Sequence, residues 1–290
     1  MRVLLILLMS VLLYGCGSSA SLKPATNGAK ESYSPELALT LGKLSDIAYE
    51  EVTGEELEKI GFSLDTPLIE DKATDTNGFI AYSEDKVVLA FRGTQEPKDF
   101  VQDLKAGQYQ RINEEYCEKK AFIHGGFNLP ILNINKNKEI RKIIKQRISE
   151  GREFYITGHS LGAALSNVYA YYLAADKTEI KVSGIYTYGQ PIIGNSYFAN
   201  CLDDLYQDVS FRHVNNIDII TKIKPPASSY QHTQTLVHFG RAGRSQLYNS
   251  WSIRDWFLDG MRIKSFDNHK MKSYLELLEA NRNNQPLEAN

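Results

Sequence analysis

Residues 154–173 read FYITGHSLGAALSNVYAYYL, and this stretch decides the expected fold. The apolar run 154–157 predicts a buried strand, and the residues from Leu161 onward predict a helix with small side chains in its first turns. The pentapeptide between them, residues 158–162, has the form G-x-S-x-G, which in a strand–turn–helix context holds a serine on a sharp, strained turn. Its glycines let strand and helix approach closely, so that the hydroxyl is lifted out of the sheet. Ser160 is therefore the candidate nucleophile.

The segments on both sides of this stretch alternate between strands and helices. Short β-forming runs bounded by turn residues predict strands at 79–82, 87–91, 154–157, 182–188 and 209–214, the first two as a hairpin. A helix is expected to begin at Pro35, because Ser34 is a good N-cap and proline suits the first helical position. Another is expected around residues 140–148, whose isoleucines share one face. No internal repeat interrupts the pattern, so residues 35–290 are expected to form one α/β domain.

A serine needs a general base, and the base needs an acid that orients it. Four histidines follow Ser160 in the chain: His213, His232, His238 and His269. Asp218 is the candidate acid, because it follows a predicted strand at a polar turn, where the carboxyl ends of strands present their side chains. His213 precedes Asp218 within the strand pattern, which favours a structural histidine.

Motifs in register along the chain resemble those of the class 3 lipases, the family of the fungal-type triacylglycerol lipases. They are AFRGT (90–94), IHGGF (123–127), the serine pentapeptide, YGQP with GN (188–195), VNNID (214–218), and His269 with Tyr274 behind it. The resemblance covers roughly residues 35–280. It implies an α/β-hydrolase fold, with a central, mostly parallel sheet flanked by helices. It also implies a catalytic triad of Ser160, Asp218 and His269.

Two other histidines compete with His269 for the role of base. Tyr230-Gln231-His232 resembles a segment that the family places before its catalytic histidine, and residues 236–239 alternate like a strand, which favours a packing role for His238. His269 is preferred because a catalytic histidine must lie on a loop that reaches the serine. His124, in the IHGGF motif, is expected to be structural.

An oxyanion hole is expected from two backbone segments. One donor is the N–H of Leu161, the residue after the nucleophile, and the resemblance makes Thr94 the second, through its N–H and its hydroxyl. Between Thr94 and His124, residues 98–105 (KDFVQDLK) resemble the lid of these lipases, although an ordinary amphipathic helix has the same pattern. The sequence leaves both readings of this segment open.

The substrate is expected to be a lipid ester, cleaved through an acyl-enzyme without a metal or organic cofactor. After Asp218 the family shows apolar residues, whereas this chain has Lys222 and Lys224, which suit an anionic phospholipid or a shorter acyl ester. Two alternatives to a triacylglycerol lipase therefore stay open. One is a phospholipase or short-chain carboxylesterase, and the other is a catalytically idle hydrolase-fold lipoprotein that binds lipid or a partner.

The composition excludes several other classes of protein. The chain has 290 residues, of which 42% are hydrophobic, and a formal net charge of −2, which suits a globular domain and not a nucleic-acid binder. Its three cysteines, Cys16, Cys117 and Cys201, lie too far apart for a zinc site and are too few for a disulfide scaffold. Cys117 and Cys201 are left as either a disulfide or two free thiols.

The N-terminus has the pattern of an export signal. A basic start and the apolar run 3–13 predict a signal peptide over residues 1–15. Leu13-Tyr14-Gly15-Cys16 resembles a bacterial lipobox, in which the cysteine after the cleavage site carries lipid. Residues 16–34 are expected to be a flexible tether. The sequence thus predicts an exported lipoprotein anchored to the membrane through Cys16, with a secreted enzyme as the alternative.

Overall fold

The computed structural model describes residues 27–96, 109–112, 117, 120–223, 229–233, 235–240, 243–248 and 266–288. The expected signal peptide, Cys16 and the lid-like segment 98–105 lie outside these residues. Within the described part of the chain, no helix is long and apolar enough to cross a membrane.

The centre of the molecule is a nine-stranded sheet in the order β1-β2-β3-β6-β7-β9-β11-β12-β13. Strands β3, β6, β7, β9 and β11 pair in parallel, whereas β1–β2, β2–β3 and β11–β12 pair antiparallel. The bounds are β1 Ser63–Asp71, β2 Thr76–Tyr82, β3 Lys86–Phe91, β6 Glu153–His159, β7 Gly184–Tyr188, β9 Ser210–Asn215, β11 Leu236–Phe239, β12 Ser245–Tyr248 and β13 Leu287–Glu288. The predicted mostly parallel sheet is therefore confirmed, as are the hairpin and the five predicted strands.

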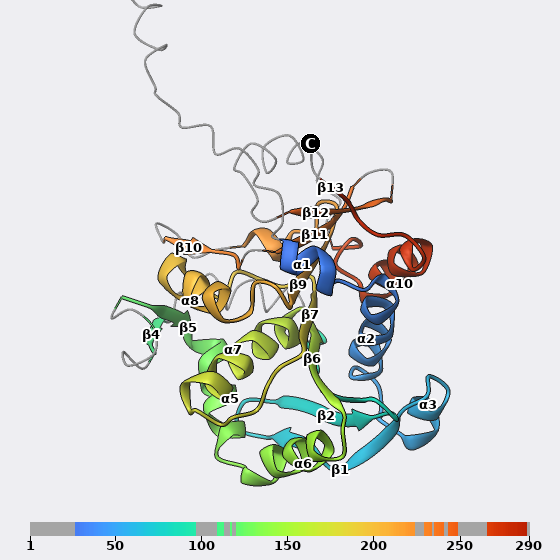
Figure 1. The fold of residues 1–290 in the computed structure, drawn as a ribbon. Coiled ribbons are helices and arrows are strands. Elements are labelled where there is room, and N and C mark those ends of the chain that lie inside the picture. The colour runs from blue at the N-terminus through green and yellow to red at the C-terminus, as the bar shows by residue number, and fades with distance from the viewer. Residues whose placement is uncertain are drawn as a thin grey trace, which may run out of the picture.

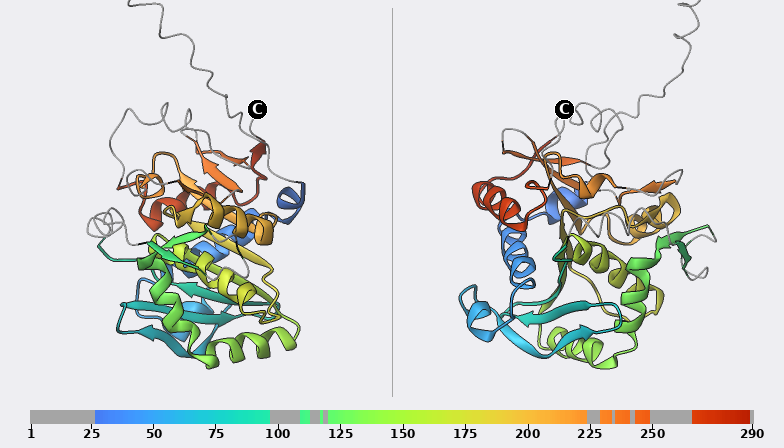
Figure 2. Two further views of the ribbon diagram at one scale, coloured as in Figure 1. Left: turned by 90° about the vertical axis from the view of Figure 1, so that its left-hand side faces the viewer. Right: turned by 180° about the vertical axis from the view of Figure 1, so that it is seen from behind.

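Both faces of the sheet are covered by helices, because its strands are apolar on both sides. In β3, Val87, Leu89 and Phe91 enter one hydrophobic cluster, and Val88 and Ala90 enter the other. The first cluster lies under α5 (Gly125–Asn135), α6 (Lys138–Ser149), α7 (Leu161–Ala175) and α8 (Ser196–Tyr206). The second lies under α2 (Pro35–Ile47) and α10 (Met271–Asn281), which lie side by side in Figures 1 and 2.

Helix α2 begins as the sequence predicts, and the capping-box pattern of residues 53–56 (TGEE) predicts the start of α3 (Gly54–Glu58). Ser34 caps α2 by accepting a hydrogen bond from the Leu37 N–H at 3.2 Å. Thr53 caps α3 in the same way through the Glu56 N–H. Each cap satisfies one of the N–H groups that a helix leaves without an internal partner.

Part of the segment expected to be a tether has regular structure. Residues 27–34 were predicted to be part of the tether, but Asn27–Ser32 form helix α1 and Tyr33 is buried. The Tyr33 hydroxyl lies 3.1 Å from Nε2 of His213, and its ring packs on Phe211 and Tyr186. Sequence composition did not show this, because the contacts of Tyr33 come from strands more than 150 residues away.

A second, four-stranded sheet in the order β10-β8-β5-β4 lies beside α8. Its strands are short: β4 Tyr109–Arg111, β5 Phe122–His124, β8 Gly194–Asn195 and β10 Tyr230–Gln231. A disulfide between Cys117 and Cys201, with Cα atoms 5.7 Å apart, joins the chain before β5 to α8. The alternative of two free thiols is thereby decided in favour of the disulfide.

Candidate active site

The serine pentapeptide forms a tight turn between β6 and α7. Ser160 has φ +57° and ψ −122°, a backbone conformation that a non-glycine residue adopts only when the surrounding structure enforces it. Its N–H donates to the Tyr188 carbonyl oxygen at 2.9 Å, which ties the turn to β7. A Cβ at Gly162 would lie 2.2 Å from the carbonyl oxygen of Phe91. Glycine is therefore required where α7 crosses the end of β3.

The structure brings Ser160, His269 and Asp218 together, although they are separated in the chain by 109 and 51 residues. His269 Nε2 lies 2.8 Å from the Ser160 Oγ, and His269 Nδ1 lies 2.8 Å from the Asp218 Oδ2. The three residues are 1%, 3% and 0% exposed, respectively. This is the relative placement that a nucleophile, a general base and an orienting acid need.

Asp218 accepts two further hydrogen bonds. Its Oδ1 accepts from the Ile220 N–H at 2.9 Å, and its Oδ2 accepts from the Tyr274 hydroxyl at 2.7 Å. Burial, and then the charge of Asp218, raise the pKa of Tyr274 well above its ordinary value, so Tyr274 remains a donor. The Tyr274 hydroxyl oxygen also accepts a hydrogen bond from the Asn215 N–H at 3.0 Å. Hydrogen bonds to both of its oxygens thus hold the Asp218 carboxylate in place.

The loop that carries His269 is fixed at several points. His269 comes two residues before α10, and its N–H donates to the Phe266 carbonyl oxygen at 3.2 Å. The Asn215 side chain donates to the carbonyl of Asn268 at 3.0 Å. Gly189 has φ +59°, and a Cβ there would lie 2.9 Å from both the His269 ring and the Asp218 Oδ2. The glycine of the YGQP motif therefore leaves the space that these two side chains occupy.

The two expected oxyanion donors come from the start of α7 and from the loop after β3. Leu161 is the first residue of α7, so its N–H has no partner four residues earlier in the helix. Thr94 follows β3 and lines the same cavity as His269. The Thr94 Oγ1 accepts from the Glu96 N–H at 3.3 Å, which leaves its own hydroxyl hydrogen available to donate.

The remaining histidines are occupied elsewhere. His213 Nδ1 donates to the Thr187 carbonyl oxygen at 3.0 Å, and burial lowers its pKa to about 3. His232 donates to the Thr221 carbonyl oxygen, and burial followed by the charge of Arg212 lowers its pKa well below the ordinary value. His238 Nε2 lies 3.2 Å from the Asn216 carbonyl oxygen. Among the residues that the structure describes, His269 is the histidine hydrogen-bonded to Ser160.

His124 has a structural contact, as expected: its Nδ1 accepts from the Gly126 N–H at 3.2 Å and so caps α5. Asp203, Asp204 and Asp208 precede the strand that leads to Asp218, and the sequence favours solvated loop charges at all three. Asp203 instead lies in α8, is buried, and interacts with the buried Arg212. No local pattern marks it, because its partner lies on β9.

Two residues near the serine have no role that the motifs predict. His159 precedes Ser160 and is buried, with its Nε2 2.6 Å from the carbonyl oxygen of His269. The hydroxyl of Tyr49, just after α2, lies 2.7 Å from His159 Nδ1. His159 occupies the variable position before the serine in G-x-S-x-G, whereas Tyr49 belongs to no motif.

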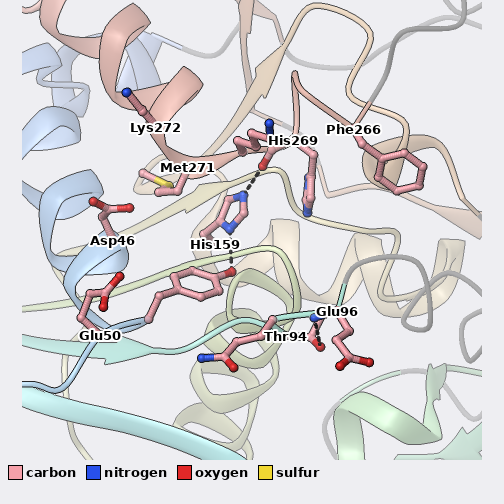
Figure 3. Close-up of a pocket in the computed structure, with 12 residues that line it drawn as sticks. Asp46, Glu50, Thr94, Glu96, His159, Phe266, His269, Met271 and Lys272 are labelled. Carbon is pink, nitrogen blue, oxygen red and sulfur yellow. Dashed lines mark hydrogen bonds between the residues drawn. The ribbon is translucent and has the colours of Figure 1, made fainter.

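A cavity of about 710 Å³ opens beside His269 (Figure 3). Its charged lining comes from α2 (Asp46 and Glu50), from the loop after β3 (Glu96), and from the His269 loop and α10 (Lys270 and Lys272). Partial burial, and then the nearby Glu50, raise the pKa of the Asp46 carboxyl. Lys270 pairs with Asp267 at 2.8 Å. Among the described lining residues, three carboxylates stand against two lysines.

No metal-binding cluster of three His, Cys, Asp or Glu side chains occurs among the described residues. Lys222 lies on the short 3₁₀ helix Ile220–Lys222 and does not line the cavity, and Lys224 lies outside the described residues.

Residues 88–228 match the family model described as Lipase (class 3). Among curated proteins, the chain is 28% identical over 156 residues to the secreted mono- and diacylglycerol lipase 1 of Fusarium solani, covering 51% of this chain and 42% of that one. It is 44% identical over 109 residues to the triacylglycerol lipase OBL1 of Arabidopsis thaliana, covering 35% and 20%. It is 26% identical over 168 residues to the chloroplastic phospholipase A(1) DAD1 of the same plant, covering 50% and 37%. The chain thus spans less than half the length of each of these relatives.

Solved lipase structures share the fold over most of the chain. The lipase of Rhizopus microsporus var. chinensis superimposes with a TM-score of 0.68 at 20% identity, covering 86% of this chain and 88% of that one. The Lip2 lipase of Yarrowia lipolytica gives a TM-score of 0.68 at 19% identity, covering 86% and 94%. Together with the sheet order, these matches establish an α/β-hydrolase fold.

Proposed function

We propose that this chain is a class 3-type lipase, a serine hydrolase of lipid carboxylic esters. The observation that carries the proposal is the continuous hydrogen-bonded series from Ser160 Oγ through His269 to Asp218, with both distances at 2.8 Å. It is supported by the class 3 lipase model match and by relatives named as lipases.

In this proposal Ser160 Oγ attacks the ester carbonyl carbon while His269 Nε2 takes the hydroxyl proton. Asp218 holds Nδ1–H, so that Nε2 is the basic nitrogen. The N–H of Leu161 and the Thr94 hydroxyl donate to the oxyanion. His269 then gives the proton to the departing alcohol, which leaves an acyl group on Ser160. Water activated by His269 releases the fatty acid and restores the serine.

The charges of the cavity favour an uncharged leaving group. Carboxylates outnumber lysines on its wall, and Lys270 is already paired with Asp267. A phosphate-bearing leaving group that entered this cavity would face more carboxylates than lysines among the described lining residues. Mono-, di- and triacylglycerols are therefore the favoured substrates. The phospholipase A(1) relative makes a phospholipid the second candidate, and Lys222 and Lys224 were the sequence features in its favour.

A substrate panel with one acyl chain tests the proposal. We expect dioleoylglycerol to be hydrolysed faster than dioleoyl phosphatidylcholine or phosphatidylglycerol in the same mixed micelles, and Ser160→Ala to abolish all three activities. Faster cleavage of the phospholipids would reverse the substrate order. Absence of hydrolysis of every ester by folded wild-type protein would refute the proposed function.

We also propose that the chain is exported and held at a membrane by lipid on Cys16, with release as a secreted enzyme as the alternative. The apolar run 3–13 and the lipobox-like segment before Cys16 support anchoring. Relatives named as secreted lipases support export in general. Expression with labelled palmitate tests this: the label should enter the wild-type chain and be lost in Cys16→Ser. Equal labelling of both chains, or of neither, would contradict anchoring through Cys16.

A further inference from the structure

Three groups beside the triad form a second series of hydrogen bonds, which the proposed mechanism does not use. The Tyr49 hydroxyl lies 2.7 Å from His159 Nδ1, and His159 Nε2 lies 2.6 Å from the backbone carbonyl oxygen of His269. Figure 3 shows both bonds, with His159 between the end of α2 and the loop of His269. The series thus joins α2, the residue before the nucleophile, and the backbone of the candidate base.

The direction of each bond is fixed by its partners. A carbonyl oxygen only accepts, so His159 Nε2 must carry a hydrogen. Burial, and then the neighbouring His269, lower the pKa of His159 well below its ordinary value, so the ring is neutral and Nδ1 is an acceptor. The Tyr49 hydroxyl must therefore donate to Nδ1. Burial raises the pKa of Tyr49, which keeps its proton in place.

The same tyrosine hydroxyl also lies against the oxyanion loop. A Cβ at Gly93 would lie 2.0 Å from the Tyr49 Oη and 2.6 Å from the His159 carbonyl oxygen. Gly93 directly precedes Thr94. The hydroxyl therefore packs on the loop that carries one expected oxyanion donor while it donates to the histidine that holds the base.

We propose that Tyr49 and His159 are positioning residues that fix the His269 backbone and the Gly93-Thr94 loop relative to Ser160. The proposal rests on the proposed ester hydrolase function. Neither residue exchanges a proton with the substrate. Their effect is geometric: the His269 ring reaches both Ser160 and Asp218 only if its backbone stays in place, and misplacement of about 1 Å costs on the order of a hundredfold in rate.

The test compares the rate of Ser160 modification with its extent. A fluorophosphonate probe, applied to the full chain, gives a second-order rate constant and a final number of labels per chain. Tyr49→Phe removes only the hydroxyl, and we expect the rate constant to fall about five- to thirtyfold, as for the loss of one hydrogen bond. The number of labels per chain should stay at the wild-type value. With a soluble p-nitrophenyl butyrate substrate, kcat should fall by a similar factor while KM changes less than about twofold.

Substitutions at His159 separate the donor from the bulk of the ring. His159→Leu removes the donor to the His269 carbonyl, and we expect a loss of about a hundredfold. The amide nitrogen of glutamine takes a place similar to Nε2, so His159→Gln should recover at least tenfold of that loss. If Leu and Gln gave equal rates, the hydrogen bond to His269 would not be what positions the loop.

Tyr33→Phe is the matched control. It removes the same hydroxyl from another buried tyrosine–histidine pair, Tyr33 and His213, which makes no bond to His269. Its labelling rate should stay within about twofold of wild type. A wild-type rate for Tyr49→Phe, or a fall in labels per chain that accounts for the whole loss, would overturn the positioning role. Failure of the folded wild-type chain to react would instead refute the proposed hydrolase function.

Discussion

The hydrogen bonds of Asp218 make its replacement by asparagine a sharp test of the triad. The side-chain amide has two orientations. With its oxygen at the Oδ1 position it keeps the bond from the Ile220 N–H, and its NH₂ then faces His269 Nδ1 and the Tyr274 hydroxyl. With its oxygen at the Oδ2 position it keeps the bonds from His269 and Tyr274, but its NH₂ then faces the Ile220 N–H.

The number of buried donors left unpaired decides between these orientations. The first orientation leaves only the Tyr274 O–H without an acceptor. The second leaves both the Ile220 N–H and the asparagine NH₂ without an acceptor. One extra buried unpaired donor costs about 1–3 kcal/mol, so the first orientation should dominate by roughly five- to a hundredfold. In that orientation the NH₂ donates to His269 Nδ1, which puts the proton on Nε2 and leaves no base for Ser160. The wrong tautomer in a serine protease costs about ten-thousandfold in kcat.

The minor orientation keeps the active tautomer but lacks the negative charge that stabilises the protonated His269 ring. We therefore expect Asp218→Asn to lower kcat for p-nitrophenyl butyrate by between about a hundredfold and ten-thousandfold. Steady-state kinetics, together with the thermal midpoint of each variant, measure this. Asp204→Asn is the control, because Asp204 is an exposed carboxylate on α8 and should retain wild-type turnover. If Asp218→Asn kept a tenth or more of the wild-type kcat, Asp218 would not be the residue that orients His269.

Three further outcomes follow from the same structure. The proposed oxyanion role of the Thr94 hydroxyl predicts that Thr94→Val lowers kcat about a hundred- to a thousandfold, whereas Thr94→Ser retains most activity. Equal kinetics of the two variants would remove the hydroxyl from the oxyanion hole. Gly162→Ala should give little soluble, active protein, because its Cβ would lie 2.2 Å from the Phe91 carbonyl oxygen. A Cβ at Gly54 in α3 would meet no atom within 4 Å, so Gly54→Ala should raise the free energy of unfolding by up to about 1 kcal/mol. Expression yield and urea titration of the two variants measure these effects. Burial lowers the pKa of His213 to about 3, below its unfolded value near 6.5, so the unfolded chain binds the extra proton and stability is lost as pH falls below 6.5. The free energy of unfolding should drop by about 2 kcal/mol from this group between pH 8 and pH 5, and a His213→Gln variant with the same pH slope as wild type would contradict that assignment.

The part of the fold that surrounds the serine was predictable because its signals are local. Apolar runs, caps at Ser34 and Thr53, and the glycines around Ser160 act through near neighbours in the chain, and the corresponding strands and helices are confirmed. The Cys117–Cys201 disulfide and the burial of Tyr33 were not predictable from local signals. Both depend on contacts between segments far apart in the sequence.

In the candidate site, too, residues that stand in motifs were predictable from the sequence and residues placed by distant contacts were not. Ser160, Asp218, His269 and Thr94 each stand in a motif, and the structure brings the first three into hydrogen-bonding contact, while their catalytic roles remain predictions. Tyr49 stands in no motif. Its relation to the site depends on α2 passing the end of β6, which is a consequence of how the second hydrophobic cluster packs and not of any local pattern.

The central claim is that Ser160 becomes acylated by its lipid ester substrate. Rapid mixing of the full chain with dioleoylglycerol in micelles, acid quenching within the first turnover, and mass analysis of the peptides test it directly. The account predicts one oleoyl group per chain, on the peptide that contains Ser160, and its absence in Ser160→Ala. An acyl group on another residue, or ester hydrolysis that persists in folded Ser160→Ala, would contradict it.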